Sequence, residues 1–283
     1  MSRKWHRLRR PGRRSDRMNI RAVRSRSVVE TLHVNGDAFE CLRIPGPALR
    51  VPIVFLHEGL GSVSHWRDFP YELCRATGRA GFVYSRLGYG QSGPARPRRP
   101  DYFIEEGQMR LPAILDAAGI DRAVLFGHSD GASIAIAGAA SLGSRVAALV
   151  LVASHVFTEH QGLAAVRDAI EAYSSSDLRE RLGRHHRDVD RAFYDWADAW
   201  LDPAFLDFDL TPQLEEIGCP ALVIQGLADP YGTITQTDAI AAAVPGPTQR
   251  LDLADTGHSP HREVPDLVIS TTVAFLDRHV AVG

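Results

Sequence analysis

The sequence predicts an α/β protein with a mostly parallel, doubly wound sheet, an N-terminal antiparallel hairpin and an inserted helical lid. After residue 50, short runs rich in Val, Leu and Ile alternate with helix-length segments, which is typical of parallel strands covered by helices on both faces. The alternation breaks between Ala153 and Ala221, where about 65 residues contain no convincing strand. With 283 residues and 45% hydrophobic composition, the chain can bury one large core that carries such an insertion.

The hairpin comes first in the chain. Two runs with strand composition, 28–34 and 37–44, are separated by Asn35-Gly36. Asn-Gly supplies the positive φ angles of a two-residue turn, so these runs are expected to pair as antiparallel strands.

The remaining core elements alternate in type. Strands are expected at 51–56, 81–85, 122–126, 147–153, 221–226 and 248–253. Helices are expected at 67–77, 104–118, 130–142, 234–243 and 263–278. The hairpin and these elements form a core made of residues 28–154 and 219–283.

The insertion spans residues 155–218. A structureless loop of that length is improbable in a compact domain, so the segment should form its own helices. Candidates lie at 158–175, 177–186 and 189–200. Open α/β sheets bind ligands beyond the carboxyl ends of their strands, and we expect the insertion to lie over those ends as a lid.

Charge is distributed unevenly. Residues 1–27 hold eleven Lys or Arg and one acidic residue, whereas the rest of the chain holds 21 and 33. A basic arm can bind nucleic acid through its phosphates, but a disordered tail, or a true start at Met18, explains the composition equally simply. We expect a disordered arm and no nucleic-acid partner. The sequence does not determine the oligomeric state.

Cysteine content and hydropathy bear on the compartment. Cys41, Cys74 and Cys219 are dispersed and odd in number, which argues against a disulfide framework and for a reducing environment. No apolar run reaches the length of a membrane span, and none follows Arg13-Arg14 as in a secretion signal. We expect a cytoplasmic protein that does not engage membranes.

A short motif suggests the chemistry. The strand at 122–126 leads into Gly127-His-Ser129-Asp-Gly131, and a helix follows. A strand that enters a helix through a very tight turn needs small flanking residues, and it exposes the side chain at its apex. Ser129 is therefore a candidate nucleophile. The simpler alternative is an ordinary strand-to-helix turn with a capping serine.

A serine hydroxyl needs a base and an orienting carboxylate, here expected after later strands in the order acid, then histidine. Asp229 follows the strand at 221–226, and His258 follows the strand at 248–253. Alone, each is an ordinary loop residue. Their order and position together predict a Ser129–His258–Asp229 triad.

The loop after strand 51–56 completes the expected site. Its sequence, Leu-His-Glu-Gly-Leu-Gly-Ser, is flexible enough to present backbone amides to an oxyanion. We expect one donor to be Gly59 N–H, with Leu60 as the alternative, and the other to be Asp130 N–H. A phosphate-binding loop would need a Gly-Lys-Ser/Thr ending, which is absent.

These segments resemble the α/β-hydrolase fold superfamily, in its serine esterase-like branch with a helical lid. The resemblance covers residue 28 to the C-terminus and includes 51–66, the Arg-Leu-Gly-Tyr-Gly-Gln-Ser loop within 84–93, and the turns at 127–131, 226–229 and 257–258. It implies the same triad and places the lid at 155–218. Two residues depart from the usual pattern: Glu58 stands where the loop has glycine, and Ala132 replaces a second glycine.

The resemblance and the motif favour a serine hydrolase of small carboxylic esters, working through an acyl-enzyme. Alternatives are carbon–carbon bond hydrolysis or a lyase reaction on the same triad, and a non-catalytic ligand receptor. No metal or organic cofactor is expected, because the histidine pairs lack cysteine or carboxylate neighbours.

Substrate choice is expected to lie in the lid, with Tyr194, Trp196 and Trp200 as candidate substrate contacts. The segment 188–209 holds seven aspartates and one arginine, a composition that usually marks a solvated face, although beside Asp130 it could favour a cationic substrate. The alternative is that Asp130 pairs with an arginine such as Arg86.

Overall fold

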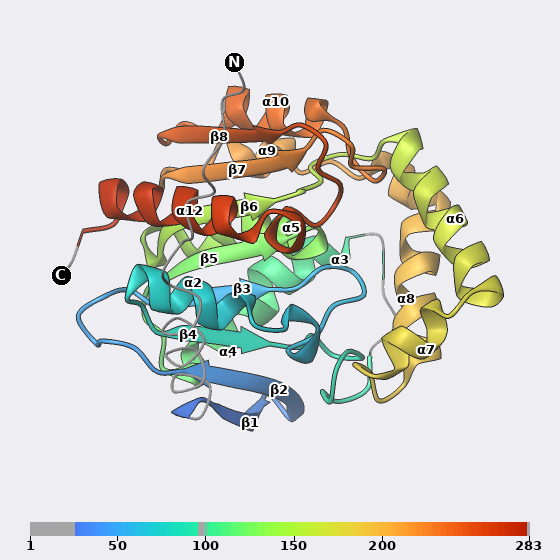
Figure 1. The fold of residues 1–283 in the computed structure, drawn as a ribbon, viewed down its shortest axis with the longest axis horizontal. Helices are drawn as coiled ribbons and strands as arrows, with labels where there is room; N and C mark the ends of the chain where they lie inside the picture. The colour runs from blue at the N-terminus through green and yellow to red at the C-terminus, as the bar shows by residue number, and fades with distance from the viewer. Residues whose placement is uncertain (1–25, 96–98, 100, 282–283) are drawn as a thin grey trace, which may run out of the picture.

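The protein is described from a computed structural model, which covers residues 26–95, 99 and 101–281. An eight-stranded sheet in the order β1-β2-β4-β3-β5-β6-β7-β8 forms its centre (Figure 1). The strands are β1 (Val28–Val34), β2 (Asp37–Ile44), β3 (Ile53–Leu56), β4 (Gly81–Tyr84), β5 (Ala123–His128), β6 (Val146–Val152), β7 (Ala221–Gly226) and β8 (Thr248–Leu253).

The antiparallel part of the sheet is confined to its N-terminal edge. β1 pairs with β2 and β2 with β4 in antiparallel fashion, while the strands from β4 to β8 are parallel. Asn35 and Gly36 have φ angles of 52° and 86°, as the two-residue turn requires. The predicted fold class, including the hairpin, is therefore confirmed. The predicted arm at 1–27 lies outside the described residues apart from its last two.

Helices cover both faces of the sheet. The core helices are α2 (Phe69–Thr77), α3 (Tyr102–Glu105), α4 (Leu111–Ala118), α5 (Asp130–Leu142), α10 (Ile234–Ala243), α11 (Pro260–Glu263) and α12 (Pro265–His279). Short turns η1 (Ser64–Trp66) and η3 (Gly143–Arg145) join them. The buried side chains of α2 and α12 pack on one face, and those of α4, α5 and α10 pack on the other. Figure 1 shows α2 and α12 toward the viewer.

The helix expected at 104–118 is interrupted. A π-helical turn, η2 (Glu106–Arg110), separates α3 from α4. Gly107 lies so close to α5 that an added Cβ would sit 2.6 Å from the backbone nitrogen of Gly138. The π-helical turn, with its one extra residue, lies where the two helices approach closely. Hydrophobic periodicity does not predict such an approach.

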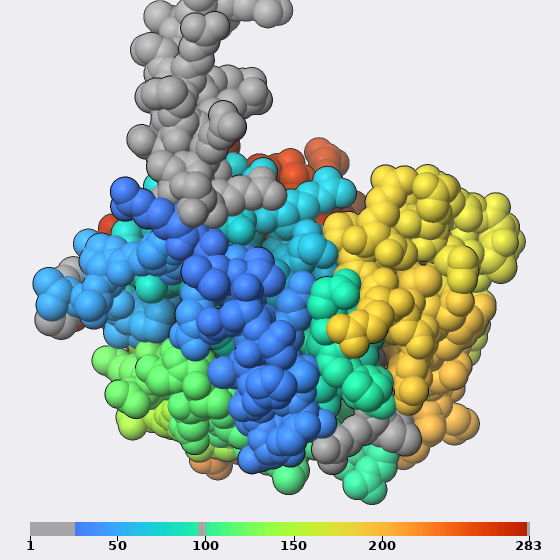
Figure 2. Space-filling view, turned by 90° about the horizontal axis from the view of Figure 1, so that it is seen from below, coloured from blue at the N-terminus to red at the C-terminus, as the bar shows by residue number. Residues whose placement is uncertain are grey.

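The segment between β6 and β7 is helical, as predicted. It contains α6 (His160–Ser175), α7 (Leu178–Gly183), α8 (Val189–Leu201), η4 (Pro203–Asp207) and α9 (Thr211–Leu214). We call residues 155–218 the insertion. Its helices α6, α7 and α8 stand beside one end of the sheet in Figure 1, whereas α9 lies next to α10; in Figure 2 the yellow part of the insertion forms a lobe next to the blue and green core.

Candidate active site

Ser129 occupies the tight turn between β5 and α5. Its φ of 53° lies in the left-handed region, which costs a non-glycine residue on the order of 1–3 kcal/mol. A Cβ on Gly131 would collide with the carbonyl oxygen of Leu56, and one on Gly127 with the backbone of Gly131. Glycine is therefore required at both flanks for Ser129 to stand at the carboxyl end of the sheet.

Asp229 and His258 follow β7 and β8, which are neighbours in the sheet. His258 Nδ1 lies 2.8 Å and 2.9 Å from the two carboxylate oxygens of Asp229. Gln225 Nε2 and the Tyr231 N–H also donate to this carboxylate, at 2.9 Å and 2.8 Å. Burial raises the pKa of the Asp229 carboxyl, but the charge and hydrogen bond of His258 outweigh burial and hold this pKa at about 2. Asp229 is therefore ionised over the whole working range of a protein.

Ser129 and His258 line the same cavity. His128, the residue before Ser129, contacts the carbonyl oxygen of His258 through Nε2 at 2.7 Å. The turn that carries Ser129 and the loop that carries His258 are thus joined directly. Within the described residues, Ser129 Oγ has no hydrogen-bond partner, so it is available to a ligand in the cavity.

Backbone amides converge on this cavity from two loops. Gly59, Leu60 and Asp130 all line it, and among the described residues their N–H groups have no hydrogen-bond partner. Asp130 is the first residue of α5, where an amide has no intrahelical acceptor. The structure thus brings both expected oxyanion donors, and the reserve Leu60, to the cavity that holds Ser129.

The carboxylate of Asp130 is buried and fully occupied. Tyr102 Oη donates to it at 2.7 Å, Trp200 Nε1 donates at 3.3 Å, and Arg86 Nη2 lies 3.6 Å away. The expectation that this carboxylate attracts a substrate cation is therefore wrong, and the alternative pairing with Arg86 is the one observed. The Trp200 contact also ties the insertion to the start of α5.

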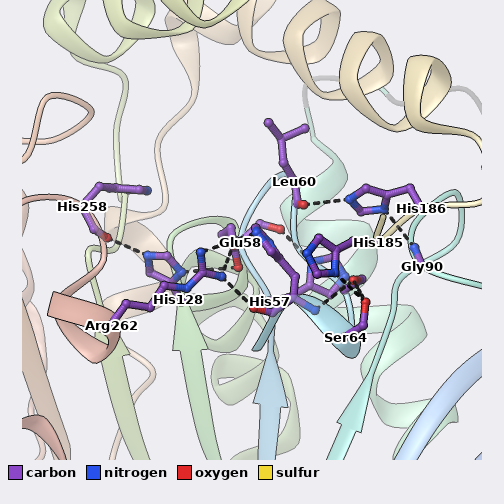
Figure 3. Close-up of polar contacts among 12 residues, drawn as sticks. His57, Glu58, Leu60, Ser64, Gly90, His128, His185, His186, His258 and Arg262 are labelled. Carbon is purple, nitrogen blue, oxygen red and sulfur yellow. Dashed lines mark hydrogen bonds and ion pairs between the residues drawn. The ribbon is translucent and has the colours of Figure 1, made fainter. Parts of the chain in front are cut away.

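A second carboxylate, that of Glu58, lies on the cavity wall. Glu58 Oε1 lies 2.9 Å from His65 Nδ1 and 3.3 Å from Arg262 Nη2, and its Oε2 lies 3.4 Å from His128 Nδ1 (Figure 3). Burial raises the pKa of Glu58, but the charges and hydrogen bonds of His65 and His128 outweigh it and leave this pKa well below its usual range. The signal in the sequence was the departure from glycine at position 58.

Two adjacent histidines connect the insertion to the core loops. His186 accepts a hydrogen bond from Gly90 N–H at 3.1 Å and contacts the carbonyl oxygen of Leu60 through Nε2 at 2.9 Å (Figure 3). His185 Nδ1 lies 2.9 Å from Ser64 Oγ. The loop with the candidate oxyanion donors is therefore held from the insertion side.

The cavity has a volume of about 510 Å³. Trp196 and Trp200 of α8 line it, and Trp196 packs so closely on Gly59 that no Cβ fits between them. Tyr194, however, is not a lining residue, and its side chain is 44% exposed. The expected contact from Tyr194 is corrected for a geometric reason: residues 196 and 200 share a helix face, and residue 194 does not.

Two absences concern the described residues only. They contain no cluster of three or more His, Cys, Asp or Glu side chains that could hold a metal ion. None of their helices is long and apolar enough to cross a membrane.

The sheet order, the glycine-flanked serine after β5, and the acid and histidine after β7 and β8 define a hydrolase of the α/β class. A family comparison agrees: the model described as "Alpha/beta hydrolase family" matches residues 53–271. The chain belongs to this family, which confirms the resemblance found in the sequence.

Individual relatives are more distant. The chain is 33% identical over 119 residues to 1-acylglycerol-3-phosphate O-acyltransferase ABHD5 of Sus scrofa, covering 41% of this chain and 33% of that protein. It is 33% identical over 128 residues to lipase LipV of Mycobacterium tuberculosis, covering 45% of each. These alignments span less than half the length of either curated relative.

Among solved structures, a putative lipase (lip1) from Acinetobacter baumannii superposes with a TM-score of 0.74 at 17% identity. The superposition covers 93% of this chain and 96% of that one. At this identity the likeness concerns the fold alone.

Proposed function

We propose that the protein is a serine hydrolase of small carboxylic esters that works through an acyl-enzyme. One observation carries the proposal. A single cavity is lined by Ser129, by His258 and by the amides of Gly59, Leu60 and Asp130, which have no partner among the described residues, and Asp229 contacts His258 at Nδ1. The names of LipV as a lipase and ABHD5 as an acyltransferase, both acyl chemistries, agree with it.

In the proposed reaction Ser129 Oγ attacks the ester carbonyl carbon while its proton passes to His258 Nε2. The carbonyl oxygen becomes an oxyanion that accepts hydrogen bonds from Asp130 N–H and from Gly59 or Leu60 N–H. The intermediate collapses, the bond to the alcohol oxygen breaks, and His258 returns the proton to that oxygen. Water then attacks the acyl-Ser129 ester with His258 as base, releasing the acid and restoring the serine.

Asp229 supports this cycle by orientation. A carboxylate that remains ionised accepts a hydrogen bond from the Nδ1–H of His258, which leaves Nε2 as the base toward Ser129. The charge of Asp229 also stabilises the imidazolium that forms when His258 takes up the serine proton.

As part of the proposal, the insertion acts as a lid. Trp196 on Gly59, Trp200 on Asp130 and His186 on Leu60 place its side chains directly on the loops with the oxyanion donors. A cavity of about 510 Å³ suits a small ester, and displacement of water from it by the ester strengthens the hydrogen bonds to the oxyanion. The three free cysteines agree with a cytoplasmic location.

Labelling with a fluorophosphonate tests the proposal, together with turnover of p-nitrophenyl esters of increasing chain length. We expect labelling at Ser129 and fastest turnover with short acyl chains. Ser129→Ala should lose label and lower kcat on the order of 10⁴-fold or more. Ser154→Ala is the matched control, because Ser154 is buried nearby but does not line the cavity. Label on another serine, or turnover of diketones without turnover of esters, would overturn the proposal.

A further inference from the structure

We infer that the ester cleaved at this site carries an ionised carboxylate, which is held by a cationic wall of the cavity. The inference rests on the proposed function, because it names the substrate class of the same site. The cationic wall consists of Arg67 beside η1, Arg181 of α7 and Arg262 of α11, which all line the cavity with Ser129.

The charges on the cavity wall do not cancel. Glu58 and Asp130 are the two carboxylates that line it. Glu58 is engaged by Arg262 and two histidines, and Asp130 by Arg86. The charge of Arg67 therefore remains in excess, and Arg181 is paired only with the exposed Asp177, so the wall favours a negative group in the cavity.

The guanidinium of Arg67 is available to a ligand in the cavity. Within the described part of the chain its guanidinium makes no ion pair or hydrogen bond, although Arg262 nearby has three polar contacts. Its backbone φ is 56°, in the left-handed region where glycine would be less strained. Because Arg67 is exposed and has no protein partner within the described residues, its charge is available to a ligand at the edge of the cavity.

Arg181 of α7 and His185 of the turn that follows α7 both contribute to the cavity wall from the insertion. Arg181 pairs with Asp177 at 3.2 Å, but both side chains are more than half exposed, so water competes with this pair and a ligand can replace it. The pKa of His185 falls to about 4, first through burial and then through the charges of His65, Arg67 and Arg262. The positive charges of the wall thus lower the pKa of a neighbouring histidine, as they would favour a bound anion.

The acidic segment of the insertion does not offset this field. The seven aspartates between 188 and 209 are absent from the cavity lining. Four of these aspartates make local contacts. Asp188, Asp202 and Asp209 accept hydrogen bonds from nearby backbone N–H groups, and Asp190 forms an ion pair with Arg179. The predicted preference for a cationic substrate is therefore replaced by a preference for an anion.

The rest of the cavity suits the carbon skeleton of such a substrate. Its apolar lining comes from the insertion and from the loop after β7: Leu178, Leu182, Trp196, Trp200 and Tyr231. An ester with a short carbon chain and a terminal carboxylate matches one apolar and one cationic wall.

Two pairs of isosteric esters test the inference. One pair carries the charge on the acyl side, p-nitrophenyl glutarate against p-nitrophenyl glutaramate. The other carries it on the alcohol side, the acetate ester of 4-hydroxybutanoate against that of 4-hydroxybutanamide. We expect kcat/KM to be roughly tenfold higher for the carboxylate member of at least one pair, and this advantage to shrink as salt is added.

Variants locate the effect. Arg67→Gln and Arg181→Gln should each lower the ratio of kcat/KM for the preferred carboxylate ester to that for its amide partner by roughly threefold or more. Arg184→Gln is the control, because Arg184 lies on the same stretch of the insertion, pairs with Glu180 and does not line the cavity. Equal rates for both members of both pairs, or equal effects of Arg184→Gln, would overturn the inference.

A binding measurement separates this inference from the proposed function. If no ester is hydrolysed and no fluorophosphonate label appears at Ser129, the proposed function has failed. The Ser129→Ala variant is then titrated with glutarate and with glutaramide, and the fluorescence of Trp196 and Trp200 in the cavity wall reports binding. Binding of glutarate that Arg67→Gln weakens supports the cationic wall. Equal binding of the two compounds, or binding of neither, refutes it.

Discussion

Two carboxylates meet histidines in this protein, and they are held in different ways. Asp229 takes its other hydrogen bonds from Gln225 and Tyr231, four residues before it and two after it. Glu58 has one partner in its own loop, His65, and two from distant segments of the chain, His128 and Arg262.

The difference indicates two tasks. Local partners hold the Asp229 carboxylate rigidly toward one imidazole, which suits the control of a single proton. Partners from distant segments make Glu58 a junction between the loop after β3, the turn at Ser129 and the start of α11. We therefore expect Asp229 to affect mainly catalytic turnover and Glu58 to affect mainly the stability of the fold.

The largest expected effect tests this division directly. Asp229→Asn should lower kcat for a short ester on the order of 10³–10⁴-fold, because an amide cannot hold His258 in the required tautomer. Glu58→Gln should lower kcat by no more than about tenfold, but it should reduce the free energy of unfolding by about 2 kcal/mol, since His65 and Arg262 lose a charged partner.

The measurements are steady-state turnover and urea unfolding of both variants. Asp238→Asn serves as the control, because Asp238 is an exposed partner of Arg250 on the protein surface. Equal losses of kcat in the two variants would remove the distinction between the two carboxylates.

Acid should lower the stability of the folded protein in two separate pH ranges, first through buried histidines and then through Asp229. Burial is the first cause that lowers the pKa of His155 and of His186, each to about 4. These rings are neutral in the folded protein, so the unfolded chain takes up protons first as the pH falls. Their contribution to stability is complete above about pH 6.5 and is lost toward pH 4, at about 3 kcal/mol for each buried ring.

Asp229 follows in a lower range. Its folded pKa is about 2, so its contribution of about 2 kcal/mol is present above pH 4 and is lost between pH 4 and pH 2. Urea unfolding at pH 7.5, 6, 5 and 4 measures the upper range. His155→Gln should flatten the fall in stability there, and His33→Gln, at an exposed position of β1, should not. Stability independent of pH between 6.5 and 4 would contradict the buried neutral histidines.

The smallest effect concerns the residue next to Glu58. Gly59→Ala places a Cβ against the indole of Trp196, so the loop or α8 must shift. We expect kcat/KM to fall by roughly tenfold, because the amides of this loop move from their positions near Ser129. Gly218→Ala is the matched control, since a Cβ at that position meets no atom within 4 Å. A loss in the control as large as that at Gly59 would assign the effect to general destabilisation.

The sequence anticipated what is periodic or local. Apolar runs located the parallel strands, and Gly127 and Gly131 marked the turn at Ser129 because only glycine fits at either position, where neighbouring backbone lies too close for a Cβ. Asp229 and His258 could be predicted because both follow a strand directly, and strand ends meet at one edge of a parallel sheet.

Contacts between distant segments could not be anticipated. The cluster around Glu58 joins residues up to 204 positions apart, and nothing in the neighbourhood of His65 or Arg262 signals the meeting. The exposure of Tyr194 depends on how α8 is rotated about its axis, and alternating aromatic and aspartate residues leave that rotation open. The π-helical turn at η2 depends on the approach of Gly107 to Gly138 on another helix.

The way in which the insertion leaves and rejoins the sheet has an evolutionary consequence. Its two ends are closed by backbone pairing: Phe157 bridges Asp209, Leu210 N–H donates to the Val156 carbonyl at 2.6 Å, and Thr158 N–H donates to that of Phe208 at 3.3 Å. β6 and β7 are also adjacent strands. The helices between these paired segments therefore form a unit that is closed at its base, and its sequence can change without changing the register of any strand. Specificity can diverge in such an enzyme while the sheet and its strand-end residues are inherited unchanged.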